Sequence, residues 1–159
     1  MARIDVNMAA VSSSTRVIDE LASALFALDE GARSTSAVTA LITREVAGWA
    51  LAHGWSVRAE ARVGVPSESV HDPRLGFVDV VVHRGGDAPD LAIEIDSTDK
   101  PWSLAKLRHA ADAGMQAVWI RWGDEEWAGV YDDVDVIQLP ARRRSAPRSR
   151  VNSQLTLWP

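Results

Sequence analysis

Apolar positions recur at helical spacing twice in the first third of the chain, and each stripe predicts an amphipathic helix. Residues 1–13 are mostly small or polar, so we expect a frayed lead-in there. Ser14 or Thr15 is a candidate N-cap for the first helix, which extends to about Glu30 and which Gly31 ends. Its apolar face comprises Val17, Ile18, Leu21, Leu25 and Leu28.

The second predicted helix begins after Ser34 or Ser36 and runs to about His53, with Gly54 as its C-terminal signal. One carboxylate, that of Glu45, lies in the middle of its apolar face. A carboxylate that faces a core needs a partner, which is either a core-facing arginine or a functional site. The apolar face comprises Val38, Leu41, Ile42, Trp49 and Ala52.

Beyond this helix the pattern changes to a period of two, which is typical of β-strands. The first strand alternates as a half-buried strand does, whereas the next runs are apolar almost throughout. A helix from Pro101 to about Ala113 is predicted to bury Leu104, Leu107 and Ala111. The predicted strands cover residues 55–63, 77–84, 91–97 and 116–122, with one or two short strands in 126–139.

Carboxylates interrupt two of these apolar strands. Asp79 lies in the second strand, and Glu94 and Asp96 lie in the third. Because side chains alternate along a strand, Glu94 and Asp96 point to the same face. Clustered carboxylates repel, and a hard cation such as Mg²⁺ or Mn²⁺ would offset that repulsion. The alternative is that these acids are solvated and that the Gly-Gly-Asp stretch between the strands is an ordinary hairpin turn.

This arrangement resembles the PD-(D/E)XK nuclease superfamily, whose core runs helix, three antiparallel strands, helix, strand. Its signature is a helical Glu, an Asp on the second strand and (D/E)-x-K on the third. Asp79 matches the Asp of VDVVV, and Glu94 matches the acid of IEID. The chain departs from the family at Asp96, where the family usually has Lys. Lys100, just past the strand, and Lys106, on the next helix, are the candidates to supply the ammonium group.

The resemblance covers roughly residues 34–125. It implies an α/β fold with a restriction-endonuclease-like core, in which a mixed sheet of four or five strands is flanked by helices. It also implies that Glu45 supplies the helical carboxylate and that Asp79, Glu94 and Asp96 hold Mg²⁺ or Mn²⁺. A salt bridge to a core-facing arginine is the alternative explanation for Glu45.

The composition fits one cytoplasmic domain. The chain has 159 residues, 47% of them apolar, which is ample for a single core. It contains no Cys, so disulfides and thiolate metal sites are excluded. No run approaches the roughly 20 apolar residues of a membrane span, and the first residues do not resemble a signal peptide. We therefore expect a cytoplasmic, nucleoid-associated domain at residues 14–140 with no membrane partner.

The net charge of −5 is unevenly distributed along the chain. Residues 141–150 hold five arginines and no acid. The rest of the chain has 12 basic and 22 acidic residues, a net charge near −10, so it is a poor binder of polyanions. The candidates for contacts with DNA phosphates are Arg142, Arg143 and Arg144, with Arg74 just before the second strand.

The last residues of the sequence have the pattern of a docking peptide. Residues 141–153 have almost nothing to bury and are expected to form a linker. Residues 154–159, QLTLWP, form an apolar cluster too small to fold alone. This cluster resembles the pentapeptide by which bacterial DNA-processing proteins bind the replication sliding clamp, and the alternative is that it folds back onto its own domain. The expected contacts are Gln154, Leu155, Leu157 and Trp158.

Together these features predict a Mg²⁺- or Mn²⁺-dependent DNA endonuclease of repair or replication, tethered to the sliding clamp. One alternative is a nuclease-like module that has lost catalysis and binds only DNA or the clamp. Another is a defence-type endonuclease related to restriction enzymes. The sequence leaves open whether the protein forms a homodimer. The predicted catalytic set is Glu45, Asp79, Glu94, Asp96, Lys100 and Lys106.

Overall fold

The computed structural model describes residues 5–28, 34–63, 76–123 and 129–140. The chain forms a mixed five-stranded sheet flanked by helices, which confirms the predicted α/β class. None of the described helices is both long enough and apolar enough to span a membrane. The elements in chain order are α1 (Asp5–Phe26), α2 (Thr35–Ala52), β1 (Ser56–Arg62), β2 (Phe77–His83), β3 (Leu91–Asp96), α3 (Pro101–Asp112), β4 (Gln116–Gly123) and β5 (Asp135–Pro140).

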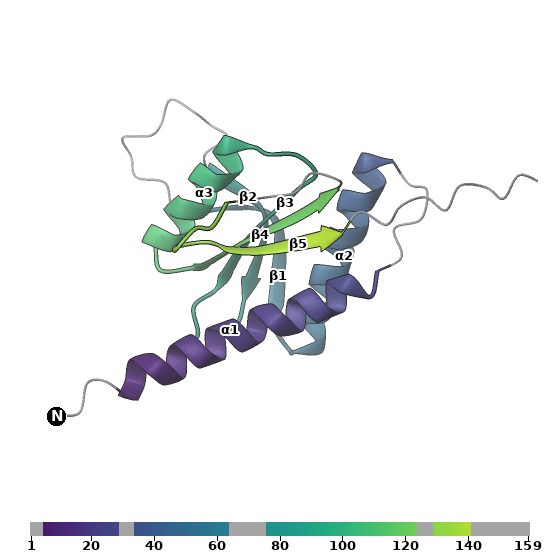
Figure 1. Ribbon diagram of the computed structural model, residues 1–159. Coiled ribbons are helices and arrows are strands. Elements are labelled where there is room, and N and C mark those ends of the chain that lie inside the picture. The colour runs from purple at the N-terminus through teal and green to yellow at the C-terminus, as the bar shows by residue number, and fades with distance from the viewer. Residues whose placement is uncertain (1–4, 29–33, 64–75, 124–128, 141–159) are drawn as a thin grey trace, which may run out of the picture.

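The sheet is antiparallel on one side and parallel on the other (Figure 1). Its strand order is β1-β2-β3-β4-β5, in which β1, β2 and β3 form an antiparallel meander. Strands β3, β4 and β5 run parallel to one another. Parallel neighbours need a crossover connection, and α3 provides it between β3 and β4. The carboxyl end of β3 therefore leads directly into the N-terminus of α3.

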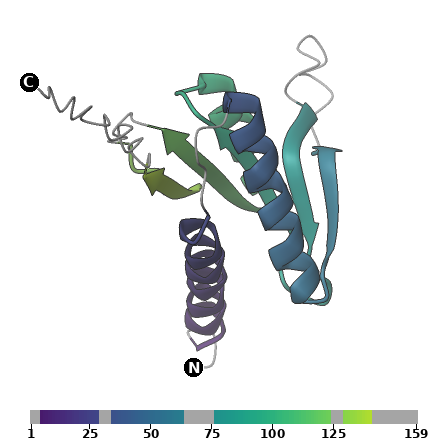
Figure 2. The same ribbon diagram turned by 90° about the vertical axis from the view of Figure 1, so that its right-hand side faces the viewer.

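Apolar side chains cover both faces of the sheet. On one face, Ile93 and Ile95 of β3 pack in a core with residues of α1 and α2. On the other face, Leu107 of α3 packs on Trp119 of β4. Figure 2 shows α2 along one side of the sheet, with α3 on the far side. The two faces are therefore distinct layers, and any strand side chain can be assigned to one of them by alternation.

The ends of α2 confirm the predicted boundaries. Ser34 is the N-cap, and its hydroxyl accepts a hydrogen bond from the backbone N–H of Ala37 at 3.3 Å. His53 is the C-cap, and Gly54 follows with a φ of 75°. That left-handed conformation is open to glycine because it has no Cβ.

Helix α1 differs from the prediction at both ends. It begins at Asp5, so it extends back through most of the segment expected to be a lead-in, and it ends at Phe26 rather than near Glu30. No Gly or Pro lies within this span, and its alanines favour a helix. Ser14 and Thr15 consequently lie inside the helix instead of capping it.

The buried stripe of α3 is rotated relative to the predicted one. Leu104 and Ala111 are only partly buried, where they pack beside the core under the helix. Two of the three buried side chains of α3, Ser103 and Ala110, are small. Lys106, one turn from two of the buried positions, faces the sheet rather than solvent. The buried residues of α3 are Ser103, Leu107 and Ala110.

Candidate active site

Strands β2 and β3 stop pairing where the acidic side chains lie. Their register begins next to the hairpin and ends at Val80 and Ile93. Beyond that point the carboxylate of Asp79 accepts a hydrogen bond from the backbone N–H of Ile95 at 2.8 Å. A side-chain oxygen thus satisfies a backbone donor of the neighbouring strand, and this bond fixes Asp79 beside β3.

Glu94 and Asp96 point from β3 toward α3, as the alternation predicts. Their neighbours Ile93 and Ile95 face the opposite way, into the core under α2, whereas Glu94 contacts Lys106 of α3. Both acids are only 2% exposed. Carboxylates buried so deeply need compensating groups, and two ammonium groups provide the compensation.

The chain has only two lysines, and both pair with these acids. The Nζ of Lys106 lies 2.7 Å from Oε1 of Glu94, and the lysine side chain is 15% exposed. The Nζ of Lys100 lies 2.6 Å from Oδ1 of Asp96, and this lysine is 46% exposed. The structure thus brings both candidate ammonium groups to the acids of β3, one on the helix and one at its N-cap.

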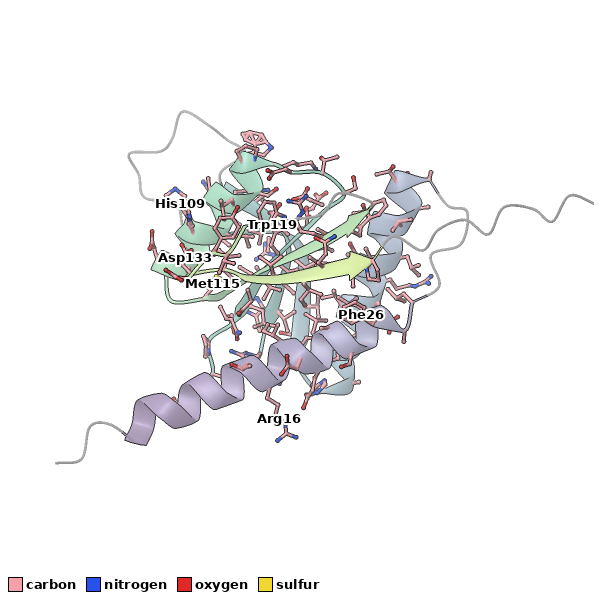
Figure 3. All side chains as sticks on the ribbon, in the orientation of Figure 1. Arg16, Phe26, His109, Met115, Trp119 and Asp133 are labelled. Atoms are coloured by element: carbon pink, nitrogen blue, oxygen red, sulfur yellow. The ribbon has the colours of Figure 1, made fainter. Side chains whose placement is uncertain are left out.

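Asp96 is held from two sides. Its Oδ1 pairs with Lys100, and its Oδ2 accepts a hydrogen bond from the indole Nε1 of Trp119 at 2.9 Å. Trp119 is fully buried beneath α3 (Figure 3), and the guanidinium of Arg121 lies 4.9 Å from its ring centroid. Because both oxygens of Asp96 are engaged, the metal-binding role expected of it has the weakest geometric support among the strand acids.

Burial shifts the ionisation of the two inner carboxyl groups. Burial raises the pKa of Glu94 from 4.5 to about 7; the charge of Asp79 adds to the rise, and Lys106 opposes it. Burial likewise raises the pKa of Asp79, against the lowering effect of its backbone hydrogen bond. The hydrogen bond to Asp96 raises the pKa of Lys100, so this ammonium stays charged at neutral pH.

Asp79 and Glu94 could hold a divalent cation. Their charges repel each other in a buried setting, and a cation between them would remove that cost. No group of three or more acidic, His or Cys side chains gathers as a metal site within the described residues. Mg²⁺ is often bound through only one or two carboxylates and keeps several waters. Asp79 and Glu94 would therefore supply two carboxylate ligands, and waters would complete the coordination.

The raised pKa of Glu94 predicts that stability falls as pH rises. Folded Glu94 keeps its proton up to about pH 7, whereas the unfolded residue releases it near 4.5, so the folded state binds more protons between these values. We expect this group to lower the free energy of unfolding by up to about 3 kcal/mol across the window. Urea denaturation at both ends of the window measures the change, and Glu94→Gln should flatten it. An equal fall in the free energy of unfolding of Glu94→Gln would show that Glu94 is not the group responsible.

Glu45 stands apart from this cluster. It lies half-buried on α2, on the face of the sheet opposite to α3. It is not among the main causes of the raised pKa of Asp79 or Glu94. Within the described part of the chain it also forms no salt bridge with an arginine. Its role as the helical carboxylate therefore stays a prediction.

The predicted contacts with DNA and with a clamp lie outside the described residues, so they too stay predictions. They comprise Arg74, Arg142, Arg143, Arg144, Gln154, Leu155, Leu157 and Trp158.

Two residues of the site, Trp119 and Arg121, were not predicted from the sequence. In the parallel register of β3 and β4, Trp119 lies beside Glu94 and Arg121 lies beside Asp96, so the four side chains share one face. Arg121 is 2% exposed, and its Nη1 lies 3.6 Å from Oδ1 of Asp99. The alternation in VWIRW indicates that Trp119 and Arg121 share a face of their strand. To place them beside Glu94 and Asp96, one must also know that this strand lies next to β3 and runs parallel to it.

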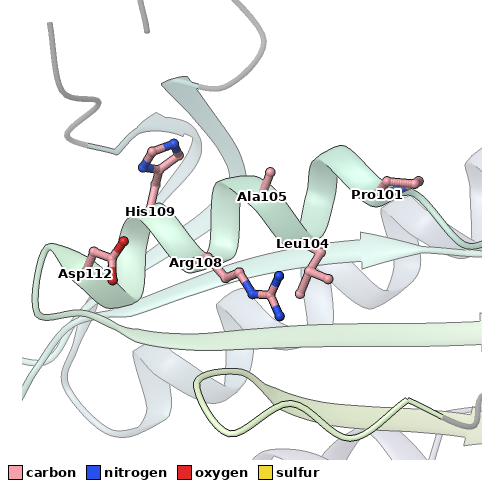
Figure 4. A pocket seen from close by; sticks show the side chains of 6 residues that line it. All are labelled: Pro101, Leu104, Ala105, Arg108, His109 and Asp112. Carbon is pink, nitrogen blue, oxygen red and sulfur yellow. The ribbon is translucent and has the colours of Figure 1, made fainter. Parts of the chain in front are cut away.

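A shallow hollow of about 270 Å³ lies on the outer side of α3 (Figure 4). Arg108 in its wall already pairs with Asp133 and stacks on the ring of Tyr131. None of the clustered acids or lysines lines the hollow, so it is separate from the candidate site. The lining residues are Pro101, Leu104, Ala105, Arg108, His109 and Asp112.

No family model matches the chain, and no curated protein or solved structure matches it either. Since many functions share one fold, the chemistry of the site is what can indicate a function. That chemistry is a half-buried carboxylate, Asp79, and a buried one, Glu94, that repel each other, with the ammonium of Lys106 beside Glu94 and that of Lys100 beside Asp96.

Proposed function

We propose that the protein is a metal-dependent nuclease that cleaves DNA phosphodiesters. The observation that carries this proposal is that both lysines of the chain pair with the buried acids Glu94 and Asp96, next to Asp79. The chain has 15 arginines, so it uses guanidinium for positive charge everywhere else. An ammonium is a compact charge with three freely rotating donors, which suits a phosphate oxygen or a reacting water.

The order of the elements supports the same proposal. The succession α2, β1, β2, β3, α3, β4 is the order that the resemblance to the PD-(D/E)XK superfamily implies. In that order Asp79 stands on the second strand and Glu94 on the third, as the signature requires. Asp96 occupies the position where the family usually has Lys, and it binds the ammonium of Lys100 there. The proposal is therefore that Lys100 supplies the missing charge from four positions further along the chain.

Each residue has a distinct part in the proposed reaction. Asp79 and Glu94 would hold the cation through carboxylate oxygens. When bound, Mg²⁺ or Mn²⁺ supplies a water of lowered pKa and stabilises charge on the phosphate. Lys100 is half-exposed and its pKa is raised, so it acts as a charged hydrogen-bond donor to the phosphate rather than as a base. Asp96, held by Trp119, keeps that ammonium in position.

The test of this function is cleavage of a panel of linear, branched and mismatched DNAs with Mg²⁺ or Mn²⁺, with and without a bacterial sliding clamp. We expect cleavage that a chelator abolishes. The replacement of the family's Lys by Asp96 favours one other candidate, a nuclease-like module without catalysis. Retained DNA or clamp binding without any cleavage would support that module, and sequence-specific cleavage without the clamp would support a defence-type endonuclease.

The double variant Lys100→Met/Lys106→Met is expected to cleave about 10²–10³-fold more slowly than the parent, the scale for removing groups that stabilise charge in a transition state. Single-turnover cleavage under saturating cation measures the loss. Arg108→Met is the matched control, because Arg108 lies on the same helix and pairs with Asp133, away from the acids. Cleavage by the double variant at the parental rate would contradict the role of both lysines.

A further inference from the structure

Lys106 pairs with one of the two candidate cation ligands. Its ammonium contacts Glu94 at 2.7 Å, and its side chain is largely enclosed between α3 and the sheet. Its positive charge acts on Asp79 as well as on Glu94. One ammonium on the sheet-facing side of the helix thus compensates the two carboxylates that are the candidate cation ligands.

The charges of this group are matched to a phosphodiester. Asp79, Glu94 and Lys106 together carry a net charge of −1 when ionised, whereas the pair of Asp96 and Lys100 and the pair of Arg121 and Asp99 are each neutral. A bound divalent cation brings the first group to +1, which is opposite to the single negative charge of a phosphodiester. Without the ammonium of Lys106, the two carboxylates attract the cation more strongly, but the loaded group is then neutral toward the substrate.

We propose that Lys106 is a built-in counter-ion that competes with the divalent cation for Glu94 and keeps the loaded site positive toward the phosphodiester. This inference rests on the proposed nuclease function, because the cation is part of that proposal. It assigns a different role to each of the two lysines. Lys106 sets cation affinity, whereas Lys100 faces the substrate.

The surroundings of the two lysines support this division. Lys100 is 46% exposed, so solvent screens much of its charge, and its partner Asp96 is also bound by Trp119. Lys106 is 15% exposed and Glu94 is 2% exposed, so their interaction is poorly screened. Removal of the Lys106 charge should therefore change the electrostatics of the acids more than removal of the Lys100 charge.

Calorimetric titration of Mn²⁺ into the full chain tests the proposal, at a pH above the Glu94 pKa of about 7. We expect Lys106→Met to bind Mn²⁺ about tenfold more tightly than the parent, a modest estimate for removing one unit charge beside a dication. Lys106→Arg retains the charge and should bind like the parent, and Lys100→Met should change the affinity less. Lys106→Met should also cleave DNA more slowly although it binds Mn²⁺ more tightly, whereas a merely structural role would weaken both.

Isotope-labelled lysine gives a second measurement on the parent protein. The chain should show two lysine side-chain resonances, which Lys100→Arg and Lys106→Arg assign. Saturating Mg²⁺ should shift the Lys106 resonance more than the Lys100 resonance, because the cation would bind Glu94, the partner of Lys106. If the parent binds Mn²⁺, two results would overturn this inference alone. One is a Lys106 resonance that does not shift, and the other is a Lys106→Met variant with the same Mn²⁺ affinity as the parent. A parent that binds no cation would overturn the proposed function, and this inference with it.

Discussion

Asp79→Asn is expected to abolish metal-dependent cleavage and at the same time to raise the melting temperature. The loss in rate should reach at least about 10²-fold, the scale for removing a group that stabilises charge in the transition state. The gain in stability follows from the raised pKa of Asp79, because partial burial disfavours its ionised form in the folded state. The amide has the same shape, and its oxygen can still accept the N–H of Ile95. Single-turnover cleavage and thermal denaturation at neutral pH measure the two effects.

Two further variants complete this test. Glu94→Gln should also abolish cleavage, and it too should raise the melting temperature, because the pKa of Glu94 is raised even though Lys106 opposes the rise. Asp87→Asn is the matched control, because Asp87 is an exposed acid in the turn between β2 and β3 and should affect neither quantity. If Asp79→Asn cleaved like the parent, the candidate site would be misassigned. If it melted at a lower temperature, the account of repelling carboxylates would be contradicted.

Leu157→Ala combined with Trp158→Ala is expected to abolish binding to a bacterial sliding clamp and to leave the melting temperature of the domain unchanged. Each large apolar side chain that enters a pocket contributes roughly 1.5–3 kcal/mol by buried area. Ordering a free peptide offsets much of this gain, so we expect a micromolar dissociation constant. Such a tether would raise the concentration of the proposed nuclease at clamp-loaded DNA, and this would matter because the body of the chain is acidic.

Calorimetry with a synthetic peptide of residues 150–159 and purified clamp measures this binding. Gln154→Ala should weaken it by removing a hydrogen bond, whereas Thr156→Ala is the control, because Thr156 lies outside the set of expected contacts. An absence of heat at high micromolar peptide would end the clamp hypothesis. A lower melting temperature after deletion of residues 152–159 would show instead that the tail packs on its own domain.

The sequence predicted those parts of the fold that local chemistry determines. Ser34 and Gly54 mark the ends of α2 because a hydroxyl cap and a left-handed glycine are local requirements. The rotation of α3 about its axis could not be predicted from the sequence. Ala110 faces the sheet and Leu104 is only partly buried, and this choice depends on how the helix packs on the sheet. The early start of α1 was missed because polar residues near Ser14 look like a cap when their surroundings are unknown.

The site was predictable to the same extent. Alternation along β3 was enough to place Glu94 and Asp96 on one face. The pairing of Lys106 with Glu94 depends on how α3 lies on the sheet, and the contact between Trp119 and Asp96 depends on the register of two strands separated by that helix. These are contacts between different segments of the chain, so the periodicity within one segment cannot predict them.

Amine chemistry would report on this site directly. Apart from the amino terminus of the chain, Lys100 and Lys106 carry the only primary amines of the protein. Lys100, at 46% exposure, would meet an acylating reagent first, whereas Lys106, at 15%, is shielded by α3 and by its ion pair. An amine-directed covalent inhibitor would therefore find almost no competing targets on this protein, because its remaining strongly basic side chains are all arginines.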